Sequence, residues 1–224
     1  MVTELRDGVW WYEASGVNAY FVADEDGVTL VDAGTPFDTL TVEKAVEEAG
    51  FSLRDVERVL VTHYDIDHVG SIAKLAIDAP IYIGREDAPF LTGEKRPLPR
   101  NIKRFTQFVS GPLVPEVAAD RVHPVTDGDD IGGFSAYHTP GHTPGHTAYV
   151  HEELAAAFLG DLVIERDGEL HPAPWFICDD HTAVDRSIEL FAAAAPEFEI
   201  AAMGHGTPFK RGGGDRLRGL AGSR

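Results

Sequence analysis

Cysteine is nearly absent from this chain, which has one, Cys178, among 224 residues. A lone cysteine cannot form an internal disulfide, and it excludes a zinc site built from several thiolates. Long hydrophobic runs are also missing, because no apolar stretch approaches the roughly 20 residues that span a bilayer. The first residues lack the basic segment followed by an apolar one that marks a secretion signal. The sequence therefore predicts a cytoplasmic protein without a membrane partner.

Positive charge is scarce, and the formal net charge is −18. So acidic a chain repels phosphate backbones, which argues against a nucleic-acid partner. The one local group of basic residues is Lys95, Arg96, Arg100, Lys103 and Arg104. Lysine itself is rare, with five lysines against fourteen arginines. An acid-rich and lysine-poor composition resembles that of proteins from extreme halophiles and predicts a halophilic protein.

Short apolar runs, rich in β-branched and aromatic residues, occur in both halves of the chain. They predict strands at Val9–Tyr12, Asn18–Ala23, Val28–Val31, Arg58–Thr62, Ile81–Ile83, Ser135–His138, Thr147–Val150, Ala156–Leu159 and Glu199–Met203. Apolar residues at helical spacing predict helices at Pro36–Glu48, Ile66–Ala76 and about Thr182–Ala194. Strands and helices in each half indicate two sheets packed together with helices outside. We expect a single domain over residues 1–224, with its core at about 8–208 and a flexible tail at about 210–224.

The densest group of polar residues directly follows a predicted strand and consists of His63, Asp65, Asp67 and His68. A loop between a strand and a helix can turn several side chains toward one point. Imidazole and carboxylate are ligands that suit zinc, iron and manganese. The alternative is a solvated polar loop in which Asp65 or Asp67 caps the following helix.

Three further segments supply the same types of ligand. Histidine recurs every four residues at His138, His142 and His146, and the prolines and glycines between them forbid a continuous helix, so this segment is predicted to be a rigid loop. Asp161 ends an apolar strand, where a carboxylate is costly unless it has a partner such as a metal ion. His205 stands between two glycines after the last predicted strand.

In this order the motifs resemble those of the metallo-β-lactamase superfamily. The family pattern is a His-x-His-x-Asp-His loop, a Pro-Gly-His-Thr loop, a Gly-Asp at a strand end and a late Gly-His. The corresponding segments here are His63–His68, Pro140–Thr143, Gly160-Asp161 and Gly204-His205, and Leu30–Gly34 resembles the family's first motif. The resemblance covers about residues 8 to 208. It implies an α/β (α+β) fold, a four-layer αββα sandwich with the site at one edge between the sheets.

The resemblance also implies a dinuclear site for two divalent metal ions, with zinc favoured and iron or manganese as alternatives. The implied ligands are His63, residue 65 and His142 for one ion, and Asp67, His68 and His205 for the other, with Asp161 bridging the two. Asp32 is then expected to orient a ligand or loop without binding metal. The same supporting role is expected of His146.

Position 65 departs from the family pattern, because Asp65 replaces the second histidine. If Asp65 binds metal, three carboxylates and one hydroxide balance two divalent ions, and the centre is neutral instead of carrying one positive charge. A carboxylate ligand also moves the preference from zinc toward iron or manganese, and flavodiiron proteins resemble this chain in having an acidic residue there. If Asp65 does not bind, the first metal position is weak or absent.

The resemblance implies a metallo-hydrolase that uses a metal-bridging hydroxide to cleave a small ester, thioester, lactone or related bond, acting as a monomer or homodimer on a small-molecule substrate. Asp67 is the expected catalytic residue, because it can accept the hydroxide proton and pass it to the leaving group. Tyr64, Trp175 and Phe176 are candidates to line the substrate pocket, with packing as the alternative for Tyr64. The segment Glu86–Leu113 is a candidate lid or an ordinary packed segment. The alternative activity is that of an iron-dependent oxidoreductase similar to persulfide dioxygenases.

Overall fold

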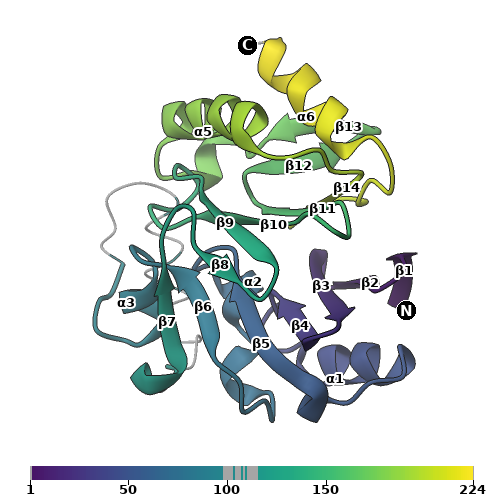
Figure 1. The fold of residues 1–224 in the computed structure, drawn as a ribbon. Coiled ribbons are helices and arrows are strands. Elements are labelled where there is room, and N and C mark those ends of the chain that lie inside the picture. The colour runs from purple at the N-terminus through teal and green to yellow at the C-terminus, as the bar shows by residue number, and fades with distance from the viewer. Residues whose placement is uncertain (1, 98–102, 104–106, 108, 110–115, 224) are drawn as a thin grey trace.

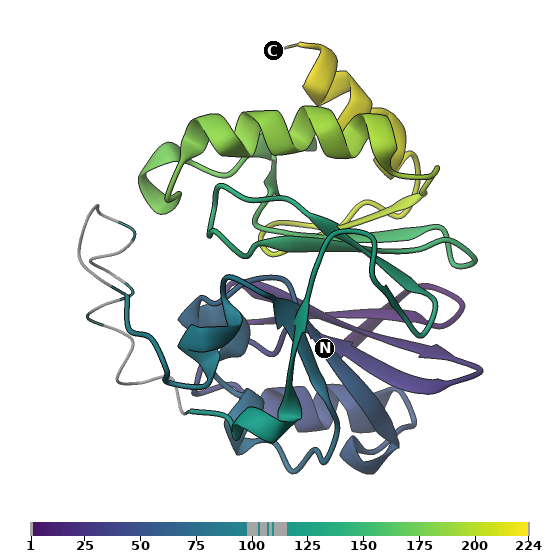
Figure 2. The same cartoon turned by 60° about the vertical axis from the view of Figure 1, so that its left-hand side comes forward.

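The computed structural model describes residues 2–97, 103, 107, 109 and 116–223. These residues form two β-sheets packed face to face, with helices covering the outer face of each (Figures 1 and 2). Figure 2 separates the four layers, with α5 (His181–Ala194) above one sheet and α1 (Thr39–Glu48) below the other. The predicted four-layer αββα sandwich is thus confirmed.

The first sheet contains seven strands that neighbour one another in chain order. They are β1 (Val2–Arg6), β2 (Val9–Ala14), β3 (Val17–Asp24), β4 (Gly27–Val31), β5 (Val56–Val61), β6 (Ile81–Gly84) and β7 (Val122–Val125). Pairing is antiparallel from β1 to β4 and parallel from β4 to β7. β5 lies inside this sheet with both faces covered, which accounts for its nearly continuous apolar sequence.

The second sheet has the strand order β14-β11-β10-β9-β8. Its strands are β8 (Asp130–Ile131), β9 (Phe134–His138), β10 (Thr147–His151), β11 (Ala156–Gly160) and β14 (Ile200–Met203), and a separate hairpin joins β12 (Val163–Arg166) to β13 (Glu169–Pro172). β10 is antiparallel to β9 and β11, while β11 is parallel to β14. Strands β9, β11 and β14 therefore all end at the same edge, where the loops that follow them meet.

Helices and short 3₁₀ turns lie outside the sheets. Beside the first sheet are α1, α2 (Ile66–Val69) and α3 (Ala88–Leu91), and beside the second are α5 and α6 (Gly213–Gly222). The 3₁₀ turns are Leu53–Asp55, Ile72–Lys74, Ala119–Arg121 and Trp175–Ile177. α1 buries Val42, Ala45 and Val46, the apolar stripe visible in its sequence.

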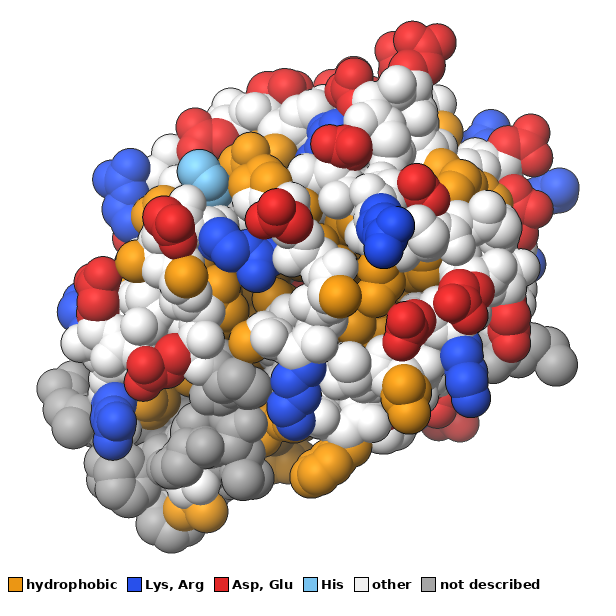
Figure 3. All heavy atoms as spheres, turned by 90° about the horizontal axis from the view of Figure 1, so that it is seen from below, with side chains coloured by type: hydrophobic (Ala, Val, Ile, Leu, Met, Phe, Trp, Pro, Cys, Tyr) orange, Lys and Arg blue, Asp and Glu red, His pale blue; other side chains and the backbone are white. Residues whose placement is uncertain are grey.

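Charged side chains are dispersed on the face of the molecule shown in Figure 3. On the face shown in Figure 3, acidic side chains are spread among basic and apolar ones and do not gather in one place. Dispersed charge of this kind keeps a protein surface hydrated. Among the helices of the described segments, none is long and apolar enough to cross a membrane.

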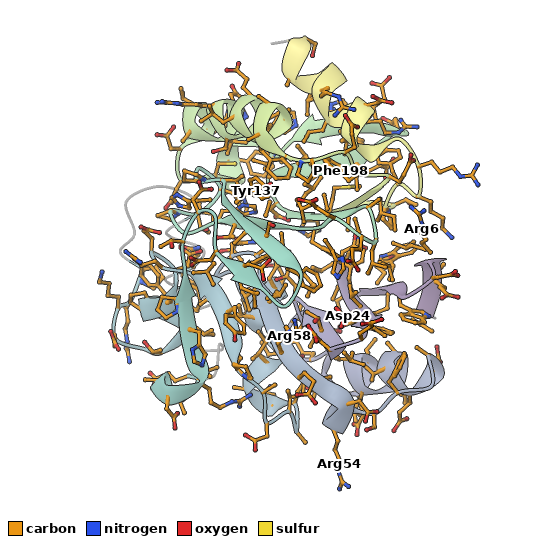
Figure 4. All side chains as sticks on the ribbon, in the orientation of Figure 1. Arg6, Asp24, Arg54, Arg58, Tyr137 and Phe198 are labelled. Atoms are coloured by element: carbon orange, nitrogen blue, oxygen red, sulfur yellow. The ribbon has the colours of Figure 1, made fainter. Side chains whose placement is uncertain are left out.

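Three apolar clusters hold the layers together. The central cluster joins the two sheets, where Tyr20 of β3 and Phe158 of β11 meet with ring centroids 5.6 Å apart. The other two lie between each sheet and its helices. Figure 4 shows Tyr137 and Phe198 on the side of the second sheet that faces α5 and α6, and their rings lie 5.1 and 6.3 Å from that of Phe191 on α5. The edge at which the loops meet is thus supported by packed strands on both sides.

The C-terminal residues correct the expected flexible tail at 210–224, because residues 213–222 form α6. Leu217 is 1% exposed and packs into the cluster between the second sheet and its helices. Gly213 approaches the sheet so closely that a Cβ there would lie 2.8 Å from the Ala201 nitrogen. Gly213 thus permits close packing of the start of this segment against the second sheet.

The predicted helix at Ile66–Ala76 is also corrected, since α2 ends after one turn at Val69. A Cβ at Gly70 would collide with the ring of Pro36 and with the Ile66 carbonyl oxygen. Gly70 therefore allows Pro36 to approach closely at the end of α2, and a 3₁₀ turn follows. The helix predicted from Pro36 begins three residues later, at Thr39.

Candidate metal centre

The ligands named by the motifs gather at the edge where the two sheets meet. Residues 63–68 follow β5 of the first sheet. His142 lies in the loop after β9, Asp161 directly follows β11, and His205 comes after β14. Because these three strands of the second sheet end at the same edge, their loops face the loop after β5.

Six of these residues form two groups, which we call the first and the second position. The first position consists of His63, His142 and Asp161, and the second position consists of Asp67, His68 and His205. Within each position the ligand atoms lie within 4.8 Å of one another. Asp161 Oδ2 lies 3.4 Å from His142 Nε2 and also 3.4 Å from His205 Nε2. Its Oδ1 lies 3.5 Å from His68 Nε2. Asp161 therefore stands between the two positions.

Three buried atoms of these groups lack a hydrogen-bond partner among the described residues, namely His63 Nε2, His68 Nε2 and Asp161 Oδ1. Buried polar atoms are normally partnered, and leaving one without a partner costs about 1–3 kcal/mol. Cations at the two positions would satisfy all three atoms. Imidazole nitrogen and carboxylate oxygen are ligands that divalent ions such as zinc accept. The residues present therefore fit a divalent metal centre.

Asp32 fixes the orientation of His68. Its Oδ2 accepts hydrogen bonds from His68 Nδ1 at 2.8 Å and from Thr62 Oγ1 at 2.7 Å, and its Oδ1 accepts one from the Thr62 nitrogen at 2.9 Å. An ionised carboxylate only accepts, so Nδ1 of His68 carries a proton and Nε2 faces the second position. This contact suits the orienting role expected of Asp32.

His146 supports Asp161 from behind. Its Nε2 accepts a hydrogen bond from the Asp161 backbone nitrogen at 3.1 Å, so the proton is on Nδ1, which donates to Thr139 Oγ1 at 2.8 Å. Both ring nitrogens therefore have protein partners. Gly160, at φ 49°, allows this close arrangement, because a Cβ there would lie 2.8 Å from His146 Nε2.

Asp87 ties the two ligand-bearing loops together, a role that the sequence did not reveal. Its Oδ2 accepts hydrogen bonds from the Tyr64 nitrogen at 3.0 Å and from Thr143 Oγ1 at 2.6 Å, and its Oδ1 accepts one from the Gly145 nitrogen at 2.9 Å. Burial raises the pKa of Asp87 even though these hydrogen bonds oppose the shift. The partners are distant in sequence, so no local pattern could have identified this contact.

Asp65 points into the first position. Its Oδ2 lies 3.0 Å from His142 Nε2 and 3.3 Å from His63 Nε2, and it also accepts a hydrogen bond from Lys103 Nζ. Its Oδ1 accepts one from Gln107 Nε2 at 2.6 Å. Asp65 occupies the N-cap residue of α2, but its side chain makes no capping hydrogen bond. The capping alternative therefore does not apply to Asp65.

Electrostatics favour a cation at the second position. Burial by itself lowers the pKa of His68, but the carboxylates of Asp32 and Asp161 raise it to about 10. Asp161 also raises the pKa of His205 to about 9. Burial alone would raise the pKa of Asp161, but its histidine neighbours hold it well below the usual range. Among themselves, these residues thus carry an excess of negative charge that stabilises positive charge.

Both positions open onto a cleft of about 400 Å³. It is lined by Asp65, Ile66, Asp67, Lys103, Gln107, His142, Asp161, Ile177 and His205. A cleft of this size suits a small molecule. Lys103, Gln107 and Ile177 were not predicted to belong to the site. Lys103 was assigned to a local basic patch, but its side chain is 3% exposed and points inward. There its ammonium group forms an ion pair with the Asp65 carboxylate.

Tyr64 packs in the core and is absent from the lining of this cleft, which corrects its assignment to the pocket. It is 7% exposed, and its ring stacks on that of Phe90 with centroids 5.6 Å apart. Burial raises the pKa of Tyr64 to about 12. The packing alternative therefore describes Tyr64.

Trp175 and Phe176 lie on the 3₁₀ turn whose third residue, Ile177, lines the cleft. Their own side chains are exposed, so a place at the mouth of the pocket stays a prediction. Of the candidate lid, Lys103 and Gln107 reach the cleft. Much of that segment lies outside the described residues.

Comparisons with known proteins agree with this geometry. A family model described as the metallo-beta-lactamase superfamily matches residues 12–205. The chain is 31% identical to the "Uncharacterized protein YobT" of Bacillus subtilis (strain 168) over 214 residues, which are 90% of this chain and 88% of YobT.

Two solved structures have a similar fold. TTHA1623, solved in a di-iron-bound form, is 27% identical with a TM-score of 0.67, and the match covers 94% of either chain. The hydrolase AbOPH of the β-lactamase superfamily is 25% identical with a TM-score of 0.67, and the match covers 84% of this chain and 72% of AbOPH. The matched family region extends over most of the chain and contains both metal positions. This chain therefore belongs to the metallo-β-lactamase superfamily.

Proposed function

We propose that this chain hydrolyses a small ester, thioester, lactone or related substrate with the help of divalent ions held at the two positions. The observation that carries the proposal is the set of three buried atoms beside the cleft, on His63, His68 and Asp161, that lack a hydrogen-bond partner among the described residues. Membership of the superfamily and the similarity to the hydrolase AbOPH support a metal-dependent hydrolase.

The two positions divide the ligands. In this proposal His63 and His142 hold one ion, Asp67, His68 and His205 hold the other, and the Asp161 carboxylate serves both. A divalent ion there supplies Lewis acidity, which makes water a nucleophile at neutral pH and polarises a carbonyl group. Asp32 and His146 orient His68 and Asp161 through the hydrogen bonds described above.

Asp67 is the proposed proton acceptor. Its side chain is 31% exposed and lines the cleft, and its Oδ2 lies 3.6 Å from His205 Nε2. A carboxylate that faces the cleft can take a proton from the attacking water and pass it to the leaving group. Asp67→Asn should therefore lower kcat by about 10²–10⁴-fold. Full turnover by an Asp67→Asn protein that retains its metal would contradict this role.

A substrate panel with matched histidine variants tests the hydrolase proposal. Thioester, lactone, phosphodiester and β-lactam substrates are tested with zinc, manganese or ferrous iron at high salt, using wild type, His142→Ala and His123→Ala. His123 is the control because it lies on β7, with its ring 5.3 Å from that of Tyr82, outside both positions. We expect turnover that a chelator abolishes, that His142→Ala loses and that His123→Ala keeps. Turnover that survives chelation, or metal binding without turnover of any substrate, argues against the proposal.

Zinc is the metal we propose, because the four histidines and two carboxylates of the two positions are ligands that zinc accepts. Iron and manganese are the alternatives, since carboxylate is a harder ligand than imidazole. The similarity to TTHA1623, solved with two irons, favours iron specifically. It supports a second candidate function, an iron-dependent oxidoreductase of the persulfide-dioxygenase type. Iron in protein purified without added metal, together with oxygen consumption on a persulfide and no hydrolysis, would select that function.

The composition and the cleft suggest further properties of the protein. A cleft of about 400 Å³ suits a small-molecule substrate, and the net charge of −18 disfavours nucleic acid as the partner. We propose that the dispersed acidic surface adapts the protein to high salt. A monomer or homodimer is the proposed oligomeric state, which sedimentation at several salt concentrations would measure.

A further inference from the structure

Lys103 places a positive charge at the first position. Its side chain is 3% exposed, and Nζ donates to Asp65 Oδ2 and lies 2.6 Å from His142 Nε2. A buried ammonium group is costly unless it is paired and hydrogen-bonded. Two partners of this ammonium group are a carboxylate inside the first position and one of the proposed metal ligands.

Lys103 and a metal ion make use of the same atom of His142. With the imidazole proton on Nδ1, Nε2 of His142 has one lone pair, which either accepts a hydrogen bond from Lys103 Nζ or binds an ion. The other ring nitrogen, Nδ1, lies on the far side of the imidazole, 3.9 Å from Cys178 Sγ. His142 cannot turn this nitrogen to the site without giving up its present contacts. The two uses of Nε2 are therefore mutually exclusive.

Lys103 also offsets the charge that Asp65 brings. The family pattern has a neutral histidine where this chain has Asp65, which adds one negative charge. The ammonium group of Lys103 adds one positive charge in direct contact with it. The Asp65–Lys103 pair is therefore neutral, like the imidazole whose place it takes. Gln107 completes the arrangement by donating to the second carboxylate oxygen of Asp65 at 2.6 Å.

We propose that Lys103 is a built-in cation that competes with a metal ion for the first position, so that the first position binds a divalent ion more weakly than the second. The inference rests on the proposed metal centre and concerns the relative affinity of its two halves. An ion that enters the first position displaces Lys103 from His142, while Asp65 remains the partner of Lys103. The contacts of Asp65 thus favour the alternative in which it does not serve as a strong metal ligand.

Titration of the metal-free full-length protein with Co²⁺ or Zn²⁺ tests the competition. The variants are Lys103→Met, which removes the charge and keeps most of the length, Lys103→Arg, which keeps the charge, and Lys95→Met as a control at an exposed lysine. We expect wild type to bind one equivalent tightly and a second at least about tenfold more weakly. Lys103→Met should raise the affinity for the second equivalent about tenfold or more, which is the size of effect expected when a residue that contacts a metal ligand is changed. Lys103→Arg and Lys95→Met should bind the second equivalent as weakly as wild type does.

Other outcomes separate this inference from the proposed function. Two equally tight equivalents in wild type, unchanged in Lys103→Met, would overturn the competition and leave the metal centre standing. Loss of metal from a Lys103→Met protein with an unchanged circular dichroism spectrum would overturn it too, because Lys103 would then support the metal ligands. Binding of no metal by wild type would instead remove the proposed metal centre itself.

Discussion

Asp32→Asn is expected to weaken metal binding by moving a proton on His68. The Thr62 backbone nitrogen can only donate, so the asparagine oxygen stays on it and the amide nitrogen takes the place of Oδ2. That nitrogen donates to His68 Nδ1, which must then accept, and the imidazole proton moves to Nε2, the atom that faces the second position. A hydrogen bond to a charged group is worth roughly 1.5–3 kcal/mol, which corresponds to a roughly tenfold to hundredfold loss of metal affinity.

Competition with a chromophoric chelator measures this affinity on metal-free protein. Asp38→Asn is the matched control, because Asp38 is another buried aspartate that accepts three hydrogen bonds, from Ser15 Oγ and from the nitrogen and Oγ1 of Thr35, away from both positions. It should lower stability and leave metal affinity unchanged. The reasoning is refuted if folded Asp32→Asn binds metal within about twofold of wild type, or if Asp38→Asn shows the same loss.

Three further outcomes are expected. Leu217→Ala should lower the free energy of unfolding, measured by urea denaturation, by about 2–5 kcal/mol, because this side chain of α6 is 1% exposed. A negligible change would mean that α6 adds nothing to the core. The metal-free protein should lose stability as the pH rises from about 6.5 through about 9, since Asp161 raises the pKa of His205 to about 9 and the protonated form stabilises the folded state. His205→Gln should reduce the slope of Tm against pH in that range, where His68, with a pKa of about 10, continues to contribute, and an unchanged slope would contradict the assignment. Raising NaCl from about 0.1 to about 2 M should raise Tm, because salt screens the repulsion within a chain of net charge −18, and a constant Tm would oppose adaptation to salt.

The strands that the sequence predicted are those with continuous or alternating apolar residues. The five strands that it did not predict, β1, β7, β8, β12 and β13, are short and lie at or beyond the sheet edges. β7 contains His123 and Pro124, both exposed, and a proline in a strand is tolerated only where no ladder hydrogen bond is needed from it. β1, β8, β12 and β13 pair with a strand next to them in the sequence, whereas β7 pairs with β6, about 40 residues away. Short edge strands of this kind carry too few apolar residues to give a pattern of their own.

The candidate ligands could be named from the sequence because each follows the end of a recognisable strand. The topology then places β9, β11 and β14 in one direction, so residues far apart in the chain meet at one edge. Asp87, Lys103 and Gln107 carry no such local signal. Asp87 contacts residues 23 and 56 positions away, and Lys103 contacts Asp65 across 38 positions. Only the assembled fold reveals these partners.

Position 65 shows how a tertiary partner changes the meaning of a motif. As an isolated departure, Asp65 lowers the charge of the proposed centre by one. Two divalent ions with the carboxylates of Asp67 and Asp161 and one hydroxide sum to +1, and Asp65 alone would reduce this to zero. Because Lys103 contacts Asp65 directly, the pair adds no net charge and the sum stays at +1. The cleft should therefore attract an anionic substrate as strongly as a cleft with histidine at position 65 would.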